Sequence, residues 1–470
     1  ALRLQDHPAL GAALARGEAV VPVYLHAPEE EWPWPAGGAS RWWLHHSLAA
    51  LARQIEARGS RLILRRPQDS GAELLALARH AGATRIHWHR RYEPAVIERD
   101  AGIKARLRAA GLECESFNGS LLHEPWAVKT RAGAPYQVFT PFRRSLLALG
   151  GPQPVLSAPD SLPPPAKWPD SLSLAELGLL PQIRWDAGLE ATWKPGSVGA
   201  HERLRSFLAR GITGYAEARD HPDLEGTSRL SPHLHAGEIS PREIWHAVGE
   251  ASGGKGAWRE SPFLAEIIWR EFAHHLLYHF PQTPLQPLRP GFERIARSTD
   301  AQALAAWRQG RTGYPIVDAG LRQLWQTGWM HNRVRMIVAS FLVKDLLIAW
   351  QEGARWFWDT LVDADLASNT LGWQWSAGCG ADAAPYFRVF NPVSQGRKFD
   401  AGGDYVRRHV PELAGLPDQW IHEPWRAPPA VLAQAGIVLG RHYPHAIVDH
   451  GAARLRALAA FAELKDQPIL

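Results

Sequence analysis

The chain has 470 residues, a net charge of +5 at pH 7 and 22 tryptophans. This length allows two or three domains, each with its own core, and the modest positive charge permits a polyanionic partner without requiring one. The sequence has no run of eighteen apolar residues, no secretory leader and only two distant cysteines, so we expect no membrane span, no secretion and a cytoplasmic location.

Up to about residue 120, short apolar runs alternate with amphipathic stretches. We expect strands at residues 20–25, 62–64, 85–88 and 113–117, and helices at residues 41–55, 73–80 and 95–110. Ser40 is the expected N-cap of the first helix and Gly59 its stop. This alternation predicts right-handed crossovers around a Rossmann-like parallel sheet, in an α/β N-terminal domain over residues 1–125. No glycine-rich phosphate fingerprint follows these strands, which disfavours a nicotinamide-dependent dehydrogenase.

The rest of the chain is a proline-rich connector followed by helices. Residues 126–200 are predicted to connect the two domains, and residues 201–470 to form an all-α domain. Residues 334–350 are apolar nearly all round and predict one buried central helix. The innermost helical segments also carry Arg, Asn, Asp and Trp. Charges inside a core need partners, and a bound cofactor could supply them.

Two short motifs in the helical part suggest binding chemistry. Residues 226–232 (GTSRLSP) predict a helix N-terminus whose free N–H groups and hydroxyls would bind a phosphate; a plain capped helix is the alternative. Residues 266–272 (EIIWREF) place Glu266, Trp269 and Arg270 on one side of a helix, where they could pair with, stack on and neutralise a nucleotide. An i,i+4 ion pair between Glu266 and Arg270 on a solvated face is the alternative.

A series of longer blocks carries a family resemblance. The blocks are residues 312–318, 328–336, 363–369, 372–375 and 382–388, with looser matches at residues 2–8 and 138–142. They resemble the signature motifs of the DNA photolyase/cryptochrome family and follow one another along the chain in the same order as in that family. They are most similar to class I photolyases that act on cyclobutane pyrimidine dimers. The resemblance implies light-dependent repair of these dimers in DNA by electron transfer from excited FADH⁻, in a deoxyribodipyrimidine photo-lyase.

The resemblance also assigns residues to the FAD cofactor. We expect some of them to contact the phosphates and the ribityl chain. Arg335 and Asp363 are expected to pair beside the isoalloxazine, Asp365 to lie near its pyrimidine edge, and Asn369 to face its N5 atom. The implied FAD-binding residues are Tyr215, Thr227, Ser228, Arg229, Leu230, Ser231, Phe263, Arg270, Arg335, Asp363, Asp365 and Asn369. A neutral amide at position 369 can accept a hydrogen bond from protonated N5. Plant cryptochromes are expected to carry aspartate there and animal ones cysteine, so Asn369 favours repair.

A second set of residues is assigned to DNA and the lesion. Glu266, Asn332, Met336 and Asn369 are the expected catalytic residues, and neither Asn332 nor Met336 is the histidine expected of six-four photolyases. Extruding a dimer from the duplex costs less free energy than extruding normal bases, because the dimer stacks and pairs poorly. The implied DNA and lesion contacts are Arg219, Glu266, Trp269, Asn332, Arg333, Met336, Trp375, Arg388 and Arg397. Binding through these arginines should be sensitive to salt.

The family pattern is not complete. Trp373 and Trp350 match the inner tryptophans of its photoreduction chain, but Arg297 replaces the outer one. Either Trp307 or Trp356 is therefore expected to serve as the surface exit, or photoreduction is expected to be impaired. A second, antenna chromophore is open: residues 92–96 do not match the folate pattern, which leaves a deazaflavin, a flavin or none. The sequence starts within the motif that follows the first strand of family members. We therefore expect its N-terminal domain to contain one strand fewer than theirs.

The remaining expectations concern partners and alternatives. UV-damaged DNA is the expected partner, and the protein is expected to be a monomer without an obligate protein partner. A cryptochrome-like photoreceptor with FAD is the main alternative, disfavoured by Asn369 and by the end at Leu470 without a long polar tail. An ordinary flavin oxidoreductase would need a nicotinamide site. His274, His275 and His279 have helical spacing, but the sequence shows no HExxH motif and no further ligand to complete a zinc site. We therefore expect no zinc site.

Overall fold

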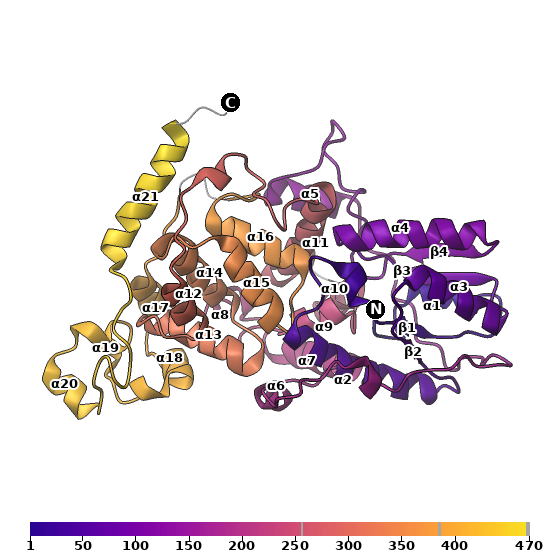
Figure 1. Cartoon of the computed structure of the whole chain (residues 1–470), viewed down its shortest axis with the longest axis horizontal. Coiled ribbons are helices and arrows are strands. Elements are labelled where there is room, and N and C mark those ends of the chain that lie inside the picture. Colours follow the sequence, from indigo (N-terminus) through magenta and orange to yellow (C-terminus); the bar gives the residue numbers. More distant parts are fainter. Residues whose placement is uncertain (255–256, 384–386, 467–470) are drawn as a thin grey trace. The chain divides into compact units, whose positions relative to one another are not determined.

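The structure is a computed structural model that describes residues 1–254, 257–383 and 387–466 (Figure 1). Its contacts divide the chain into two compact units. Unit 1 comprises Ala1–Arg210, Ser228–Pro281 and Val362–Ala367, and unit 2 comprises Gly211–Thr227, Gln282–Leu361 and Ser368–Leu470. The predicted domain limits at residues 125 and 200 are a different division and stay a prediction.

The first part of unit 1 has the α/β organisation predicted from the sequence. Its strands are short, and helices or turns connect them. The elements are α1 (Pro8–Leu14), β1 (Val23–Leu25), η1 (Pro28–Glu31), α2 (Gly38–Glu56), β2 (Ile63–Arg65), α3 (Ser70–Ala81), β3 (Arg85–His89), α4 (Pro94–Ala109) and β4 (Glu113–Phe117).

The strands pair in parallel, which confirms the crossover connections expected from the alternating pattern. Strand β1 pairs with β2, with Val23 opposite Ile63, and β3 pairs with β4, with Arg85 opposite Glu113. Within the described residues the pairing forms two small parallel sheets. Parallel neighbours need a long connection, and α2 and α4 supply it here.

Helix α2 begins earlier than predicted. It starts at Gly38 with Gly37 as its N-cap, so Ser40 is not the cap but lies inside the helix, buried. The small residues of this first turn pack inward, and their burial extends the helix beyond its capping signal. The predicted stop is confirmed: Gly59 has φ of 80°, a left-handed conformation that glycine adopts without strain.

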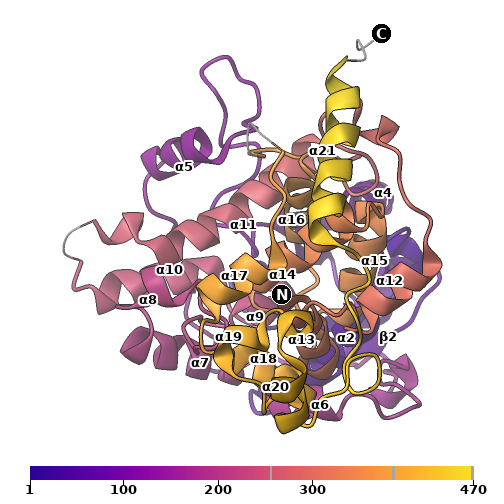
Figure 2. The same ribbon diagram turned by 90° about the vertical axis from the view of Figure 1, so that its left-hand side faces the viewer.

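The rest of unit 1 is helical. Residues 150–195 hold only two short helices, as their proline content predicted. Helix α5 packs against α11, and both views show them side by side (Figures 1 and 2). These elements are α5 (Phe139–Ala148), η2 (Ala175–Leu177), α6 (Ala187–Thr192), α7 (Ser197–Arg210), α9 (Ser231–Ala236), α10 (Pro241–Ala251), η3 (Trp258–Glu260) and α11 (Pro262–His279).

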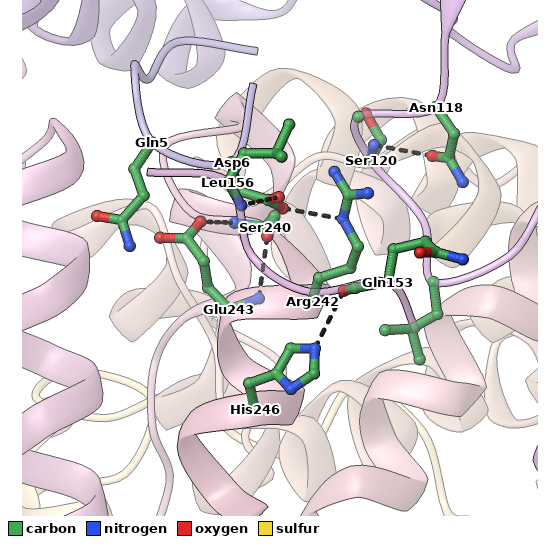
Figure 3. Close-up of polar contacts among 12 residues, drawn as sticks. Gln5, Asp6, Asn118, Ser120, Gln153, Leu156, Ser240, Arg242, Glu243 and His246 are labelled. Carbon is green, nitrogen blue, oxygen red and sulfur yellow. Dashed lines mark hydrogen bonds and ion pairs between the residues drawn. The ribbon is translucent and has the colours of Figure 1, made fainter. Parts of the chain in front are cut away.

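A buried carboxylate joins the start of the chain to the connector and to α10 (Figure 3). Asp6 is fully buried and accepts hydrogen bonds from the backbone N–H of Leu156 at 3.3 Å and from Nε of Arg242 at 2.9 Å. Ser240 and Glu243 form a capping box at the first turn of α10. The 2–8 block therefore has a structural role in unit 1, because Asp6 is desolvated and paired.

Within its described residues, unit 2 consists of helices joined by loops. Helix α13 contacts both α14 and α18. Its elements are α8 (Tyr215–Ala218), η4 (Phe292–Arg294), α12 (Ala301–Arg308), α13 (Pro315–Thr327), α14 (Asn332–Ser340), the π-helical η5 (Phe341–Asp345), α15 (Trp350–Thr360), most of α16 (Leu366–Ala377), α17 (Pro392–Phe399), α18 (Asp404–His409), η6 (Pro411–Leu413), α19 (Asp418–Ile421), η7 (Pro424–Arg426), α20 (Pro429–Gln434) and α21 (His450–Asp466).

The prediction of one continuous helix over residues 334–350 is wrong, although the segment is buried as predicted. Helix α14 ends at Ser340, the π-helical turn η5 follows, and α15 starts at Trp350. Leu347 has φ of 52°, and its carbonyl accepts the N–H of Ser298 at 2.8 Å. A residue in the left-handed region cannot continue a right-handed helix, and apolar periodicity does not reveal such a break.

A glycine of α15 allows an indole to approach the helix closely. A Cβ at Gly353 would lie 2.0 Å from the ring of Trp373, which is 2% exposed. The same ring lies edge-on to Phe357, with centroids 5.0 Å apart. The position of Trp373 therefore depends on the absence of a side chain at residue 353.

Gly353→Ala should destabilise the protein by about 1–3 kcal/mol, because the added methyl overlaps a buried ring in a packed core. Urea unfolding would measure the free energy. Ala354→Gly, one residue further along α15, is the control for helix propensity. An unchanged free energy of unfolding and an unchanged near-UV spectrum in Gly353→Ala would contradict the close approach.

Candidate functional site

The predicted phosphate motif lies at the start of a short helix in unit 1. Helix α9 begins at Ser231 with Pro232 in its first turn, as predicted, and Arg229 has φ of 50°. The Ser231 hydroxyl donates a 2.6 Å hydrogen bond to Oδ2 of the buried Asp363. Ser228 Oγ accepts from the N–H of Leu230, which is the N-cap. The motif thus presents hydroxyls and N–H groups held in place by local bonds.

Helix α11 positions the second predicted motif. Ser261 caps it by accepting from the N–H of Leu264. Arg270 Nη1 donates to the carbonyl of Ser120 at 2.6 Å. The Trp269 ring stacks on Phe139, with centroids 3.7 Å apart and planes 6° apart. One face of Trp269 is therefore covered by α5, and only the rest of the indole can meet a ligand.

A charged pair lies further along the same helix. His274 Nε2 is 3.3 Å from Oδ2 of Asp365. Burial alone would raise the pKa of Asp365, but His274, Arg270 and His235 hold it well below its usual range. Burial would likewise lower the pKa of His274, yet Asp365 raises it above the ordinary value. The two groups stabilise each other's charged forms, so Asp365 stays ionised and can accept hydrogen bonds from a ligand.

Glu271 and His275 attach the segment after β4 to α11, a role that the sequence did not predict for either residue. The Glu271 carboxylate accepts the N–H groups of Leu122 and His123 at 2.9 and 3.2 Å. Burial raises the pKa of Glu271 to about 7 in spite of these bonds. His275 accepts from the N–H of Tyr136 at 3.0 Å. Both residues lie on the buried face of α11, so their polar groups are desolvated and satisfied by these backbone bonds.

In unit 2, tryptophans and Phe357 form a buried aromatic cluster. The rings of Trp307 and Trp373 are 6.2 Å apart, and Phe357 contacts both. Trp350, at the start of α15, is 3% exposed. Trp307 is fully buried, so the prediction that it could be the surface exit is wrong. Its indole N–H donates to the carbonyl of Val338 inside the core, which the sequence could not show.

The alternative exit is half-buried and lies beside a solvent-exposed ring. Trp356 is stacked parallel to Trp325, with centroids 5.9 Å apart and planes 3° apart. Trp325 is 58% exposed. The guanidinium of Arg308 lies 5.5 Å from the Trp356 ring. This pair reaches solvent, whereas Trp307 does not.

Asn369 is held in a defined orientation on α16. Its Nδ2 donates to the carbonyl of Ala354 at 3.0 Å, so the amide is assigned with its oxygen at the other end. That oxygen can act only as an acceptor. This arrangement suits the predicted contact with a protonated flavin N5.

The start of α14 carries three further predicted residues. Asn332 is exposed, and Arg333 forms an ion pair with Asp220 at 2.8 Å. Arg333 also lies over the Phe399 ring at 4.4 Å and 4.0 Å from the Met336 sulfur. This guanidinium is thus fixed beside one of the residues assigned to the lesion.

The other predicted residues have contacts of different kinds. Arg219 lies over the ring of the buried Tyr215 at 5.5 Å, and Arg335 Nε donates to the carbonyl of Met330 at 2.8 Å. Arg397 is paired with Glu423, a partner that the sequence analysis did not consider. Trp375 is half-buried on α16.

Further outcomes concern two single residues, one sequence block, metal ligands and membrane spans. Phe263 packs on Phe207 at 4.5 Å within unit 1, and Thr227 is half-buried in unit 2. The predicted block 382–388 is described only in part, because residues 384–386 lie outside the described residues. No group of three or more metal-binding side chains is found in the part of the chain that the structure describes, and there His274 is paired with Asp365. In the same residues, no helix has the length and apolar character needed to cross a bilayer.

Comparison with known proteins identifies the family. A model described as the FAD binding domain of DNA photolyase matches residues 263–463, and one described as DNA photolyase matches residues 1–165. This chain belongs to the DNA photolyase/cryptochrome family. FAD is therefore its cofactor, as predicted, and Ser231, Asp365 and Asn369 offer hydrogen-bonding groups of the kinds that a flavin nucleotide requires.

Individual relatives include both branches of the family. A deoxyribodipyrimidine photo-lyase of Agrobacterium fabrum is 50% identical over 465 residues, 99% of this chain and 96% of that protein. Cryptochrome-1 of Arabidopsis thaliana is 40% identical over 98% of this chain and 69% of its own length. The crystal structure of a class III photolyase from Agrobacterium tumefaciens matches with a TM-score of 0.95 and 49% identity, over 99% of this chain and 96% of that one. That description is class III, whereas the motifs had suggested class I, so the subclass stays a prediction.

Asp365→Asn should lower the pKa of His274 below its ordinary value of 6.5, because burial then acts without a compensating charge. Asp365, whose pKa is depressed, contributes stability above its unfolded value of 3.8, and the raised pKa of His274 contributes stability below 6.5. The loss in free energy of unfolding, about 3 kcal/mol, should therefore be largest between these values and shrink as the pH rises through the folded pKa of His274. NMR titration of the histidine ring protons, with urea unfolding at several pH values, measures both effects. An unchanged His274 titration in the variant would contradict the pairing.

Proposed function

We propose that this protein repairs cyclobutane pyrimidine dimers in DNA when illuminated, as a deoxyribodipyrimidine photo-lyase. Asn369 is the observation that carries the proposal. Its amide nitrogen is bonded to Ala354, which leaves a neutral carbonyl oxygen as the acceptor that a reduced, protonated flavin needs. The relative named as a photo-lyase, 50% identical over 99% of this chain, supports the same function.

The chain's own residues would bind and orient the cofactor. Reduced FAD, when bound and excited by light, supplies the single electron that opens the cyclobutane ring and is returned afterwards. Ser228 would hold a phosphate through its hydroxyl and Ser231 through its backbone N–H, because the Ser231 hydroxyl already donates to Asp363. Asp365, kept ionised by His274, would accept a hydrogen bond from the flavin's pyrimidine ring. Arg335 and the remaining predicted cofactor residues stay proposals.

The residues assigned to the lesion favour the dimer over the six-four product. Asn332 and Met336 have no titratable group near neutral pH, so they cannot supply the acid catalysis that histidines would bring. From unit 1, Glu266 would hydrogen-bond the extruded bases, and Trp269 would contact them with the part of its indole that Phe139 leaves uncovered. From unit 2, Trp375 is the corresponding apolar contact.

Arginines of unit 2 are proposed to contact the DNA backbone. Arg333 is held by Asp220 and Phe399, and Arg219 lies over Tyr215, so both guanidinium groups have defined positions. A fixed cation loses less conformational entropy when it binds a phosphate. Arg388 and Arg397, the latter paired with Glu423, are the other arginines proposed for these contacts.

Illumination of the reduced holoprotein with dimer-containing oligothymidylate should restore thymine absorbance, and darkness should not. Asn369→Asp should lower the repair rate about tenfold or more, because a carboxylate beside reduced flavin adds a repulsive charge where a neutral acceptor stands. Gln302→Glu, an equal charge change at an exposed position of α12 outside the assigned site, is the comparison for general electrostatics. Binding of the oligonucleotide without recovery of absorbance in the light would overturn the proposal.

A light-sensing receptor of the cryptochrome type is the second candidate. The observation in its favour is the 40% identity to Cryptochrome-1 of Arabidopsis thaliana over 98% of this chain. Repair in the light distinguishes the two functions. The antenna chromophore (a deazaflavin, a flavin or none) and the monomeric state are separate proposals. Mass spectrometry of released chromophores and of the native protein would test them.

For photoreduction we propose that electrons enter through the aromatic cluster of unit 2. Arg297 cannot serve as an electron relay in place of an indole. Trp307 is adjacent to Trp373, so it can relay an electron, but its burial prevents exchange with a reductant in solution. The stacked pair of Trp356 and Trp325 is then the proposed surface end.

Trp307→Phe and Trp356→Phe should each slow photoreduction of the oxidised holoprotein about tenfold or more, and Trp325→Phe should shorten the lifetime of the tryptophan radical. Laser-flash absorption spectroscopy measures both quantities. Trp185→Phe, a partly exposed indole of unit 1, serves as a control. Unchanged rates in both Trp307→Phe and Trp356→Phe would exclude this route.

A further inference from the structure

A buried lysine in unit 2 contacts the segment that carries a proposed DNA-binding arginine. Lys344 lies in the π-helical turn η5 and is 1% exposed. Its Nζ is 3.2 Å from the ring centroid of Phe387 and donates to the carbonyl of Arg388 at 3.4 Å. A desolvated ammonium over an aromatic face is a strong local attachment.

Other contacts hold the same segment against the same turn. The N–H of Phe390 donates to Oγ of Ser340 at 3.2 Å, and the Phe387 ring stacks on Phe461 of α21 at 4.4 Å. The guanidinium of Arg388 lies 6.0 Å from the Phe390 ring. Contacts therefore hold both ends of residues 387–390. Among these contacts, the charged one is made by Lys344, which donates to the carbonyl of Arg388.

A cavity of about 40 Å³ lies beside these contacts. Its lining includes Lys344, Arg388, Trp375 and Arg289. Two residues proposed to contact the lesion or the DNA backbone thus border the same small space as the buried ammonium. A change at Lys344 would reach both of them.

We propose that Lys344 is a positioning residue for damaged DNA, which fixes the segment 387–390 so that Arg388 and Trp375 meet the strand in one arrangement. This inference rests on the proposed repair function and adds to it a residue that does not itself touch DNA. The attachment depends on charge, because a neutral amine has no cation–π attraction and donates a weaker hydrogen bond.

The surroundings of Lys344 place its proton loss near neutrality. Burial is the largest cause and Arg297 the next, and together they lower the pKa of Lys344 to about 7 against a smaller raising effect of Asp345. Asp345 is itself paired with His450 of α21, and Arg289 borders the cavity. Burial raises the pKa of Cys379 to about 12, so this thiol stays neutral and does not titrate in the same range. The charged attachment should therefore weaken as the pH rises through about 7.

The test compares wild type, Lys344→Arg and Lys344→Met as holoproteins at about pH 6 and about pH 8, on either side of the pKa of Lys344. Fluorescence anisotropy with a dimer-containing duplex, at constant ionic strength, gives Kd. Wild-type affinity should fall about fivefold between these pH values, in line with the strength of a desolvated cation–π contact. Lys344→Arg, whose charge persists and for which the cavity offers room, should show a flatter profile. Lys344→Met should bind weakly at both pH values.

Hydrogen exchange at the Phe390 amide provides a second readout that needs no DNA. It should accelerate with pH in wild type, beyond the intrinsic rate, and should do so less in Lys344→Arg. If Lys344→Met does not fold, the comparison of wild type with Lys344→Arg still decides the matter. Identical pH profiles for wild type and Lys344→Arg, in both affinity and exchange, would overturn the inference. If wild type does not prefer dimer-containing DNA to undamaged DNA at any pH, the repair function itself fails.

Discussion

The cost of removing charge from water is the constraint on which the two units depend. Three buried ionisable groups each have a different compensation: Asp365 has His274, Glu271 has two backbone N–H groups, and Lys344 has an aromatic face and a carbonyl. These compensations also shift pKa values in different directions, which sets what each group can do near neutral pH. An ionised Asp365 can accept from a ligand, whereas Glu271 and Lys344 change charge near neutrality.

Local pattern predicted the elements well where the signal lies along the chain. The strand–helix alternation, the parallel pairing, the stop at Gly59 and the helix start at Ser231 follow from apolar periodicity and from cap residues. The break near Leu347 could not be predicted, because it arises from a carbonyl that bonds to Ser298, about fifty residues earlier. The prediction of Ser40 as the N-cap failed for a similar reason. Packing of small residues places the start of the helix before the residue that gave the capping signal.

The candidate site shows the same difference between what local sequence predicts and what depends on tertiary contacts. Residue types and spacing suggested Ser231 and Arg270, and the family resemblance added Asp365 and Asn369, because flavin chemistry demands particular donors and acceptors. Their roles at the cofactor stay predictions. The pattern could not show which partners those groups already have. The burial of Trp307 and the pairing of Arg397 with Glu423 come from tertiary contacts between segments distant in sequence, and they changed the roles assigned from sequence.

The contact between Gly353 and Trp373 has an evolutionary consequence. Two positions twenty residues apart share one volume, so substitutions at them cannot be independent. Lineages that keep the indole at 373 should keep glycine at 353, and lineages that lose the indole should be released from that constraint. The pair should therefore show correlated variation among homologous sequences, and its loss would mark branches in which this indole no longer has a function to preserve.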